Sequence, residues 1–562
     1  MSNNQAVQNR PRLVIAEKMA KYDSAIQAGQ SQRCVAEELD IPRSTLQRWL
    51  EKRESIDADP TVTAFFESPA GTAILHRLIL AAHLVITLMG GNGVRLVCMF
   101  LELTGLNRYV ANSYGAQQKV CVQMEGAVAE FAMNEKNRLA EGMARKDITV
   151  CEDENFHSGT CLVAIEPVSN FILIEKYSDG RKSEDWTKAM DEATKGLPVA
   201  IIQSTSDEAK GILHHVKQGL GAHHSPDVFH VQHEIVKGVN GPLANKTRRA
   251  EKALEEASAE VNRHIEDKAA YSCEKHGPGR PPEFDKRIEK AREKETESRS
   301  LLETAEKHQK EVREAVQGIS DDYHPVDIET GKLKTAEEVS KALQQRFSKI
   351  EETALEAGLA EPSFNRIKKA KKVVVEMAAT IVFFYLAMKA KVEALCLMPE
   401  AEWAMINNLI PAIYLRLVSE RAKTAELQKQ LRQKSEELLN PLKARNGPFS
   451  GLEPEELTLI EEVAEECANL FQRSSSCVEG RNGLLSLRHH SLHRISDRKL
   501  AALTAVHNYM AKRNDGTTAA ERFFGLKPKD LFEYILSHVE LPGRPAQKRP
   551  QEREDKYLKM AA

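Results

Sequence analysis

An abrupt change in sequence texture divides the chain into an α/β part and a long helical part. In residues 147–237, short runs of β-branched and apolar residues alternate with helical patterns, which is typical of a sheet covered by helices. Residues 241–447 are rich in Glu, Lys, Ala and Arg, and their pattern is almost wholly helical. Compact patterning returns over residues 452–538. The sequence therefore predicts an α/β core interrupted by a large all-α insertion.

The expected insertion has its own internal organisation. Long charged helical faces at residues 247–268 and 287–316 predict coiled-coil-like arms. Gly and Pro clusters predict breaks at residues 277–282 and 318–331. Residues 373–397 form the most apolar helix of the insertion, and we expect this helix to supply its core.

Length and composition favour a multidomain globular protein. The 562 residues allow three or four domains, and a composition with 41% hydrophobic and 29% charged residues is enough to bury several cores. The nine cysteines show no CxxC pair or disulfide-like spacing, which suits a reducing cytoplasm. The polar N-terminus lacks the apolar core of a signal peptide.

Two features limit the partners of the chain. Polar and charged residues, including His76, Arg77 and His83, interrupt the apolar stretch 73–103, so this stretch predicts a buried helical pair and no membrane contact. The net charge is only −3, so the whole chain has no general attraction for nucleic acid. Contact with DNA would have to come from local basic patches.

The N-terminal region predicts two short helices joined by a turn. Val35, Ala36 and Leu39 share one face of the first helix, Asp40-Ile41-Pro42 turns the chain, and a second helix begins at Arg43 or Ser44. Burial of the apolar residues of the second helix leaves a polar face that can reach base edges and phosphates. The candidate DNA-binding residues are Arg33, Arg43, Ser44, Thr45, Gln47 and Arg48.

This segment resembles the helix-turn-helix of transposases and resolvases, in which a small residue lies where two helices cross. Ala36 and the Ser44-Thr45-Leu46 run match that pattern. An ordinary helical hairpin is the alternative interpretation. The pattern alone does not distinguish an enzyme from a regulator.

Carboxylates follow two of the expected strands. Residues 148–151, 160–165 and 171–174 predict three antiparallel strands, and Glu152-Asp153-Glu154 closes the first of them. A helix at residues 184–194 leads to a fourth strand at residues 198–203, and Asp207 follows it. Asp153 is our first choice from its triplet, and Glu152 or Glu154 remains an alternative.

Several sequence runs around these acids resemble one family. Ser206-Asp207-Glu208-Ala209-Lys210-Gly211 is similar to the S-D-x-A-K-G run of bacterial insertion-sequence transposases, and residues 225–231 resemble their D-x-F-H-V strand. Residues 476–483 resemble the glutamate-containing helix of that family, and residues 507–523 resemble its H-N-Y…R-x-D-G-x-T-x-A-E-R ending. These are the DDE transposases of the RNase H-like and retroviral integrase superfamily.

The resemblance implies a fold and a metal site. The fold would be an α/β RNase H-like catalytic core with a mixed sheet, interrupted by the all-α insertion and preceded by an all-α helix-turn-helix domain. Asp153, Asp207 and Glu479 would form the catalytic and metal-binding triad for two Mg²⁺ or Mn²⁺ ions, which stabilise the attacking and leaving oxygens of a phosphodiester. Possible accessory residues are Glu154, Asp227, His230 and Arg481.

The resemblance also implies a function and partners. The chain would bind double-stranded DNA at the terminal repeats of a mobile element, hydrolyse one strand and join the new 3′ end to target DNA. We expect a homodimer on DNA, associated with the bacterial nucleoid in the cytoplasm. A catalytically inactive, transposase-derived regulator and a coiled-coil scaffold are the two alternatives.

We assign no metal-binding role to the remaining histidine and cysteine clusters of the sequence. The histidines at 489, 490 and 493, and the pair Cys273 and His276, lack a second ligand pair at zinc spacing. The basic face from Arg366 to Lys372 and the basic tail from Arg544 to Lys559 are interpreted as solvated surfaces that could track phosphates.

The expected organisation follows from these segments. The predicted units are a helix-turn-helix domain at 12–56, a helical domain at 60–143, core parts at 147–240 and 452–538, the helical insertion at 241–447 and a mobile tail at 542–562. Asp207 and Glu479 are 272 positions apart, so the insertion must leave and re-enter the core at neighbouring points. The Gly and Pro clusters at 238–242 and 447–453 predict these junctions.

Overall fold

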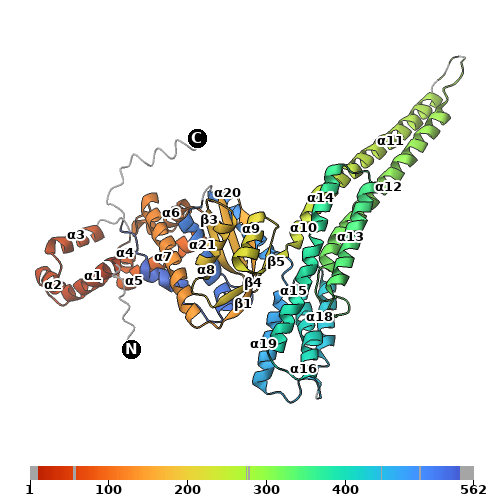
Figure 1. Cartoon of the computed structure of the whole chain (residues 1–562). Helices are drawn as coiled ribbons and strands as arrows, with labels where there is room; N and C mark the ends of the chain where they lie inside the picture. Colours follow the sequence, from red (N-terminus) through yellow and green to blue (C-terminus); the bar gives the residue numbers. More distant parts are fainter. Residues whose placement is uncertain are drawn as a thin grey trace.

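A computed structural model describes residues 11–54, 59–157, 159–273, 275, 277, 279–444, 446–492 and 495–544. Over this part of the chain, helices dominate and the strands form one five-stranded mixed sheet. The molecule is elongated, with a small helical unit at one end, the sheet in the middle and a long helical body at the other end (Figure 1). The expectation of an α/β core with a large all-α segment is confirmed at this level.

The N-terminal unit contains three helices, α1 (Pro11–Gln27), α2 (Gln32–Glu38) and α3 (Arg43–Glu54). The Ser31 side chain accepts a hydrogen bond from the backbone N–H of Cys34 and so caps α2. Asp40 has a φ of 49°, which is the left-handed conformation that reverses the chain between α2 and α3. Met19, Ala36 and Leu46 form the small buried core. Residues 55 and 56 lie outside the described residues.

A second group of helices lies between the N-terminal unit and the sheet. It consists of α4 (Pro60–Glu67), α5 (Pro69–His83), η1 (Leu84–Met89), α6 (Val94–Leu103), η2 (Leu106–Arg108) and α7 (Tyr114–Glu141). Leu75, Ile79 and Val97 belong to a small core of this group. Leu80 and Phe131 instead belong to the core that surrounds the sheet. The group therefore shares its packing with the α/β core.

Two apolar helical stretches are long enough to cross a membrane, Pro69–Met89 and Glu361–Glu393. Half of the most apolar window of the first stretch is buried inside the protein, and so is 39% of the second. Leu75, Ile79 and Leu80 of the first stretch are fully buried, as are Met377 and Met388 of the second. Both stretches therefore supply core residues, as expected for 73–103.

The sheet contains β1 (Lys146–Asn155), β2 (Thr160–Glu166), β3 (Phe171–Ser178), β4 (Val199–Ser206) and β5 (His223–Pro226) in the order β3-β2-β1-β4-β5. β1, β2 and β3 are antiparallel neighbours, whereas β4 pairs parallel with both β1 and β5. The parallel pairing of β1 with β4 ends where Glu152 lies opposite Ser206, and β1 continues to Asn155. Residues that follow this last pair therefore meet at one edge of the sheet.

Helices cover both faces of the sheet. One face packs against α8 (Ser183–Thr194), α9 (Lys210–His214) and η3 (His215–Leu220). The other face packs against α7, α20 (Ser476–Leu492) and α21 (Asp497–Tyr509), and α22 (Ala519–Phe524) and α23 (Leu531–His538) complete this layer. The C-terminal segment thus returns to the sheet after the long helical body.

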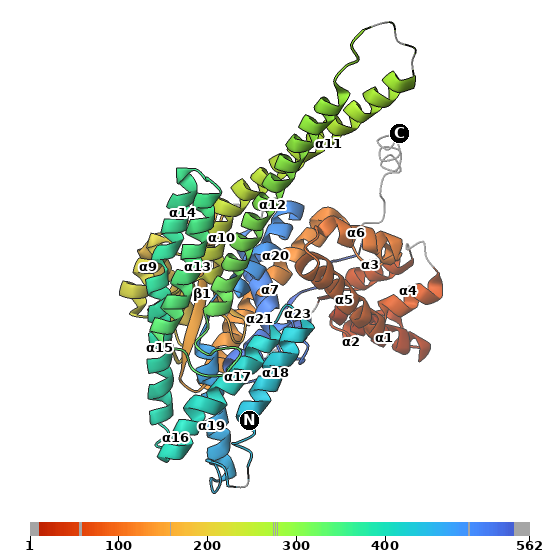
Figure 2. The same ribbon diagram turned by 90° about the vertical axis from the view of Figure 1, so that its right-hand side faces the viewer.

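The helical body has a separate hydrophobic core. Its elements are α10 (Val228–Ile235), η4 (Val236–Asn240), α11 (Gly241–Cys273), α12 (Phe284–Asp322), α13 (Ala336–Glu356), α14 (Glu361–Lys372), α15 (Val374–Glu393), α16 (Pro399–Ala404), η5 (Met405–Leu409), α17 (Ile410–Glu420), α18 (Ala425–Leu439) and α19 (Pro454–Leu470). α11 and α12 form a long hairpin arm that projects from the body (Figure 2). The break predicted from Gly318 is wrong at its start, because α12 continues to Asp322.

The structure places the junctions of the body outside the predicted positions. Core residues of the body begin at Val228 and continue to Phe471. The backbone N–H of Val228 donates to the carbonyl of Arg473 over 3.0 Å, and the Ser475 hydroxyl donates to the Asp227 carboxylate. The two junctions are neighbours, as expected, but they lie near residues 227 and 474 and not at the Gly and Pro clusters.

The strand predicted within residues 225–231 is also wrong in part. β5 ends at Pro226, and α10 begins at Val228. The Asp227 side chain accepts a hydrogen bond from the backbone N–H of Phe229 over 2.8 Å and caps the new helix. Val228, Val231 and Ile235 are buried at helical spacing. His230 therefore belongs to the first helix of the body.

The C-terminal tail begins later than expected. The backbone N–H of Ala111 donates to the carbonyl of Gly543, and Arg544 forms an ion pair with Glu67. The first residues of the predicted mobile tail are thus held against the second group of helices. Residues 545–562 lie outside the described residues.

Candidate metal centre

Asp153 and Asp207 lie side by side where β1 and β4 reach the edge of the sheet. Each follows one member of the Glu152 and Ser206 pair of the parallel register. Side chains alternate between the two faces of a strand. Asp153 and Asn155 point toward α20, because Asn482 of α20 contacts both of them. Glu152 and Glu154 point to the opposite face.

A histidine completes this group of side chains. One ligand atom each from Asp153, Asp207 and His230 lies within 4.8 Å of the others. The three residues are half-buried. They come from β1, from the turn after β4 and from α10, so both the sheet and the helical body contribute to the site.

Buried Asp227 holds His230 in place. The side chain of Asp227 is fully buried, and its carboxylate lies 3.0 Å from Nδ1 of His230. The same carboxylate accepts hydrogen bonds from the backbone N–H of Phe229 and the hydroxyl of Ser475. The Asp227 carboxylate thus binds His230, Phe229 and Ser475 at the two junctions of the helical body.

Glu479 lies at the margin of this group. Its Oε1 is 3.9 Å from Nε2 of His230, and 39% of its side chain is exposed. On the next turn of α20, Nδ2 of Asn482 donates to Oδ2 of Asp153 over 2.8 Å. The structure thus brings α20 to the site, although the Glu479 carboxylate is not part of the 4.8 Å group.

The concentration of carboxylates shifts the protonation equilibria at the site. The pKa of Asp153 is raised to about 7 by burial above all, and also by the charges of Glu479 and Asp207, against a hydrogen bond from the backbone of Glu154 and the charge of His230. The hydrogen bond with Asp227, followed by the charges of Asp227, Asp153 and Asp207, raises the pKa of His230 to about 9 against burial. Burial of Asp227 would raise its pKa, but hydrogen bonds from His230 and Ser475 lower it below the ordinary value. The site is therefore rich in negative charge and favours a cation.

The other two acids of the triplet have partners on the opposite face. Oε1 of Glu154 accepts a hydrogen bond from the indole of Trp186, and its Oε2 lies 3.2 Å from Arg181. Glu152 is fully buried, accepts a hydrogen bond from the hydroxyl of Ser204 and lies 3.3 Å from His215. The accessory role suggested for Glu154 is wrong, because its side chain points away from Asp207.

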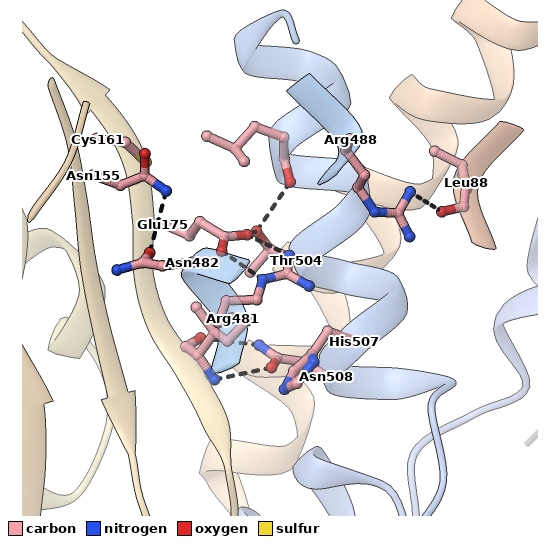
Figure 3. A network of polar contacts seen from close by, with 12 residues as sticks. Leu88, Asn155, Cys161, Glu175, Arg481, Asn482, Arg488, Thr504, His507 and Asn508 are labelled. Carbon is pink, nitrogen blue, oxygen red and sulfur yellow. Dashed lines mark hydrogen bonds and ion pairs between the residues drawn. The ribbon is translucent and has the colours of Figure 1, made fainter. Parts of the chain in front are cut away.

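Arg481 is a structural residue. Its guanidinium donates two hydrogen bonds to the Glu175 carboxylate of β3, and both side chains are buried (Figure 3). Thr504 of α21 donates to the same carboxylate over 2.6 Å. The accessory role predicted for Arg481 at the metal site is wrong, because this network ties α20 and α21 to β3.

The candidate DNA-binding residues of the N-terminal unit lie mainly on its surface. Leu46 is fully buried, while Trp49 and Leu50 are half-buried against α1 and α2. This packing leaves one polar face of α3 in solvent. Arg33, Arg43, Ser44, Gln47 and Arg48 are exposed, and Thr45 is half-buried.

The weaker sequence signals form no further metal group in the described part of the chain. The ring of His489 lies 5.3 Å from that of His157, tilted by 34°, and contacts the hydroxyl of Tyr177. His276 and His493 lie outside the described residues. On the basic face of α14, Arg366 and Lys369 pair with Glu234 of α10.

The donor set fits a divalent cation. Carboxylate oxygens are the ligands that Mg²⁺ and Mn²⁺ prefer, and imidazole nitrogen is accepted by transition metals. The half-buried position of the three side chains leaves the site open on one side for water or a substrate oxygen. Asp153, Asp207 and His230 could hold one ion directly, and the Glu479 carboxylate lies 3.9 Å from Nε2 of His230.

Comparison with known families gives a match in the C-terminal part of the chain. A model described as "Family of unknown function (DUF6399)" matches residues 405–551. The matched region starts at η5 in the helical body and includes α20 with Glu479. No curated protein matches the chain.

Proposed function

We propose that the chain is a metal-dependent DNA transposase. In this proposal it cleaves a phosphodiester at the ends of a mobile element and joins the 3′ end to target DNA. The observation that carries it is the meeting of Asp153 and Asp207 directly after the last parallel pair of β1 and β4, within reach of α20. The strand order and directions agree with the RNase H-like core that the sequence motifs resemble. The proposed centre would need both parts of the core, since the aspartates precede the helical body and α20 follows it.

Each side chain of the site would have its own role in the proposed reaction. Two Mg²⁺ or Mn²⁺ ions, when bound, would stabilise charge on the attacking and leaving oxygens. Asp153 and Asp207 would hold them at the edge of the sheet, and Glu479 would approach from α20. Asn482 keeps the Asp153 carboxylate oriented through its hydrogen bond. The half-exposed side of the site would admit the DNA backbone.

The N-terminal unit supplies the proposed recognition of DNA. The exposed polar face of α3 has the composition that reads base edges and phosphates in the major groove. The partners would be double-stranded DNA of the element ends and of the target, with the protein acting as a homodimer in the bacterial nucleoid. The low net charge means that this contact would be local.

A DNA cleavage assay tests the proposed activity. Purified full-length protein should nick DNA that carries the ends of its element when Mg²⁺ or Mn²⁺ is added. Asp153→Asn and Asp207→Asn should each abolish the product and leave DNA binding intact, because the change removes a ligand charge but little volume. Glu479→Gln should do the same, and Glu154→Gln should cleave like the unchanged protein. Full cleavage by Asp153→Asn would refute the proposed centre.

A binding assay tests the proposed recognition helix. The double variant Arg43→Ala/Arg48→Ala should bind element ends more weakly, and its plot of log affinity against log salt should be less steep by about 2. Lys21→Ala removes the same kind of charge from the exposed surface of α1 and should bind normally. Equal binding by the double variant and Lys21→Ala would move recognition to another surface.

One observation favours a second candidate function. Glu479 lies outside the 4.8 Å group, which would suit a transposase-derived regulator that binds DNA without cleaving it. The same experiments separate the two functions. A regulator would bind the DNA through α3, bind metal weakly and give no cleavage with any divalent cation.

A further inference from the structure

We propose that His230 is a nitrogen ligand of the metal centre and that this ligand makes the site prefer Mn²⁺ to Mg²⁺. The inference rests on the proposed function, because it concerns the same carboxylates. It changes the ligand set from oxygen alone to a mixture of oxygen and nitrogen. It also makes the helical body, through α10, a part of the metal centre.

The geometry leaves one nitrogen of His230 available to a metal. Nδ1 lies 3.0 Å from the Asp227 carboxylate, so a proton on Nδ1 is donated to Asp227. Without metal the ring also carries a proton on Nε2, and a bound cation would displace this proton and take the lone pair of Nε2. Nε2 lies on the side of the ring that faces Glu479, and the ring lies with Asp153 and Asp207 in the 4.8 Å group. Nε2 thus faces the Glu479 carboxylate, and the ring lies beside Asp153 and Asp207.

Asp227 is a positioning residue for His230. Metal-binding histidines commonly donate their second ring N–H to a carboxylate, which fixes the tautomer and the orientation of the ring. The Asp227 carboxylate cannot easily rotate, because the N–H of Phe229 and the hydroxyl of Ser475 also donate to it. Its side chain is fully buried, whereas a third of His230 is exposed. Asp227 is therefore the buried, fixed residue of the pair, and His230 is the partly exposed residue that faces the site.

A nitrogen ligand changes which ion the site prefers. Mg²⁺ favours hard oxygen ligands in near-ideal octahedral geometry and gives up its waters reluctantly. Mn²⁺ is a first-row transition metal and tolerates imidazole together with carboxylates. Replacing one oxygen ligand by Nε2 therefore lowers the affinity for Mg²⁺ more than the affinity for Mn²⁺. The contrary interpretation is that His230 is only a positive partner of the carboxylates and leaves when a cation binds.

Electron paramagnetic resonance of bound Mn²⁺ distinguishes these roles. Pulsed measurements detect magnetic coupling between Mn²⁺ and the ¹⁴N of a coordinated imidazole. Full-length protein with Mn²⁺ should show this coupling, and His230→Gln should lose it. His233→Gln is the matched control, because His233 is an exposed residue on the same helix, and this variant should keep the coupling.

Affinity measurements provide the second readout. His230→Gln should bind Mn²⁺ at least about tenfold more weakly, with a smaller loss for Mg²⁺ measured by competition, so that the preference between the ions shrinks. Asp227→Asn retains a helix cap of similar quality and should weaken Mn²⁺ binding while keeping part of the ¹⁴N coupling. Circular dichroism verifies that each variant is folded.

The outcomes separate this inference from the proposed function. Mn²⁺ that binds to the unchanged protein without ¹⁴N coupling, but is lost in Asp153→Asn, would overturn the role of His230 and leave the carboxylate centre standing. ¹⁴N coupling that persists in His230→Gln would also overturn it. Mn²⁺ binding that is unchanged in both Asp153→Asn and Asp207→Asn would refute the centre on which both ideas depend.

Discussion

Two carboxylate–histidine pairs lie near the ends of β1 and β4, and their surroundings differ. Glu152 and His215 are both fully buried on the face covered by α8 and η3. In the second pair, Asp227 is fully buried but a third of His230 is exposed beside Asp153 and Asp207. The same chemical pair is thus sealed on one side of the sheet and open on the other. Solvent access and the additional carboxylates, and not the pair itself, mark the candidate metal centre.

Two hydroxyl groups contact the sealed pair, in which Oε1 of Glu152 and Nε2 of His215 lie 3.3 Å apart without a hydrogen bond. The Ser204 hydroxyl donates to Glu152 over 2.7 Å, and the Thr187 hydroxyl lies 2.9 Å from Nδ1 of His215. At the open pair, the neighbouring Asp153 and Asp207 also accept hydrogen bonds, from Asn482 and from the backbone N–H of Ala209, but both residues are only half-buried. Three experiments sharpen this contrast or break it.

The largest expected effect is the loss of the sealed pair. Glu152→Ala removes a fully buried carboxylate and leaves His215 and Ser204 without their partner, so the free energy of unfolding should fall by about 3 kcal/mol or more. Denaturant unfolding measures the change, and Glu152→Gln, which keeps the volume, should lose less. Mn²⁺ affinity of the folded variant should not change. A stable Glu152→Ala protein with impaired Mn²⁺ binding would assign Glu152 to the metal centre.

The next prediction concerns Asp153 at the open site, where a substitution should raise the free energy of unfolding and not lower it. The pKa of Asp153 is raised from 3.8 to about 7, so the stability linked to this group is present below about pH 4 and is lost as the pH rises through 7. Asp153→Asn removes this dependence. At pH 8 and without metal, the variant should be more stable than the unchanged protein by about 2–4 kcal/mol, with a smaller gain at pH 5.

Unfolding curves at both pH values measure this difference, with Glu154→Gln as the control on the opposite face. Addition of Mn²⁺ should stabilise the unchanged protein and not Asp153→Asn. A variant that is less stable than the unchanged protein at pH 8 would show that the Asp153 carboxylate is a structural group and that the contrast between the faces is wrong.

The smallest effect is expected at Thr187. Thr187→Val keeps the shape of the side chain but removes the hydrogen-bond partner of Nδ1 of His215, so the free energy of unfolding should fall by about 1 kcal/mol. Thermal denaturation at neutral pH measures it, and Mn²⁺ affinity should stay the same. Weaker Mn²⁺ binding would show that the two pairs are coupled through the sheet.

The sheet could be predicted because its strands have strong local signals. Apolar β-branched runs and the turn at Asn170, which has a φ of 63°, place β1, β2 and β3 correctly. Alternation along β1 also separates Asp153 from Glu152 and Glu154, because neighbouring side chains point to opposite faces. The sequence could not show that β1 continues to Asn155, since three consecutive carboxylates resemble the end of a strand.

The junctions of the helical body could not be predicted from Gly and Pro. A Cβ atom on Gly238 would lie 2.8 Å from Cβ of Arg366, so this glycine permits close packing of η4 against α14 and does not mark a boundary. The actual junction depends on contacts between residues almost 250 positions apart, such as Val228 with Arg473. Local patterns contain no information on such pairs.

The roles of His230 and Arg481 show the same limit. Val228, Val231 and Ile235 recur at helical spacing, whereas residues 225–231 resemble a strand motif, so the two local patterns predict different structures around His230. Arg481 follows Glu479 closely, yet the rotation of α20 directs its side chain to Glu175 on β3. Which residues of a helix face a site depends on how the helix docks, and docking is a tertiary property.

The interruption of the core also has a consequence for the timing of assembly. A ribosome adds about 5–20 residues per second, so the 272 positions between Asp207 and Glu479 take roughly 15–55 s to synthesise. The strands β1 to β5 emerge first, and α20 joins them only after the whole helical body has left the ribosome. A nascent chain therefore carries both aspartates long before the glutamate. The candidate metal centre therefore lacks α20 until synthesis is nearly finished.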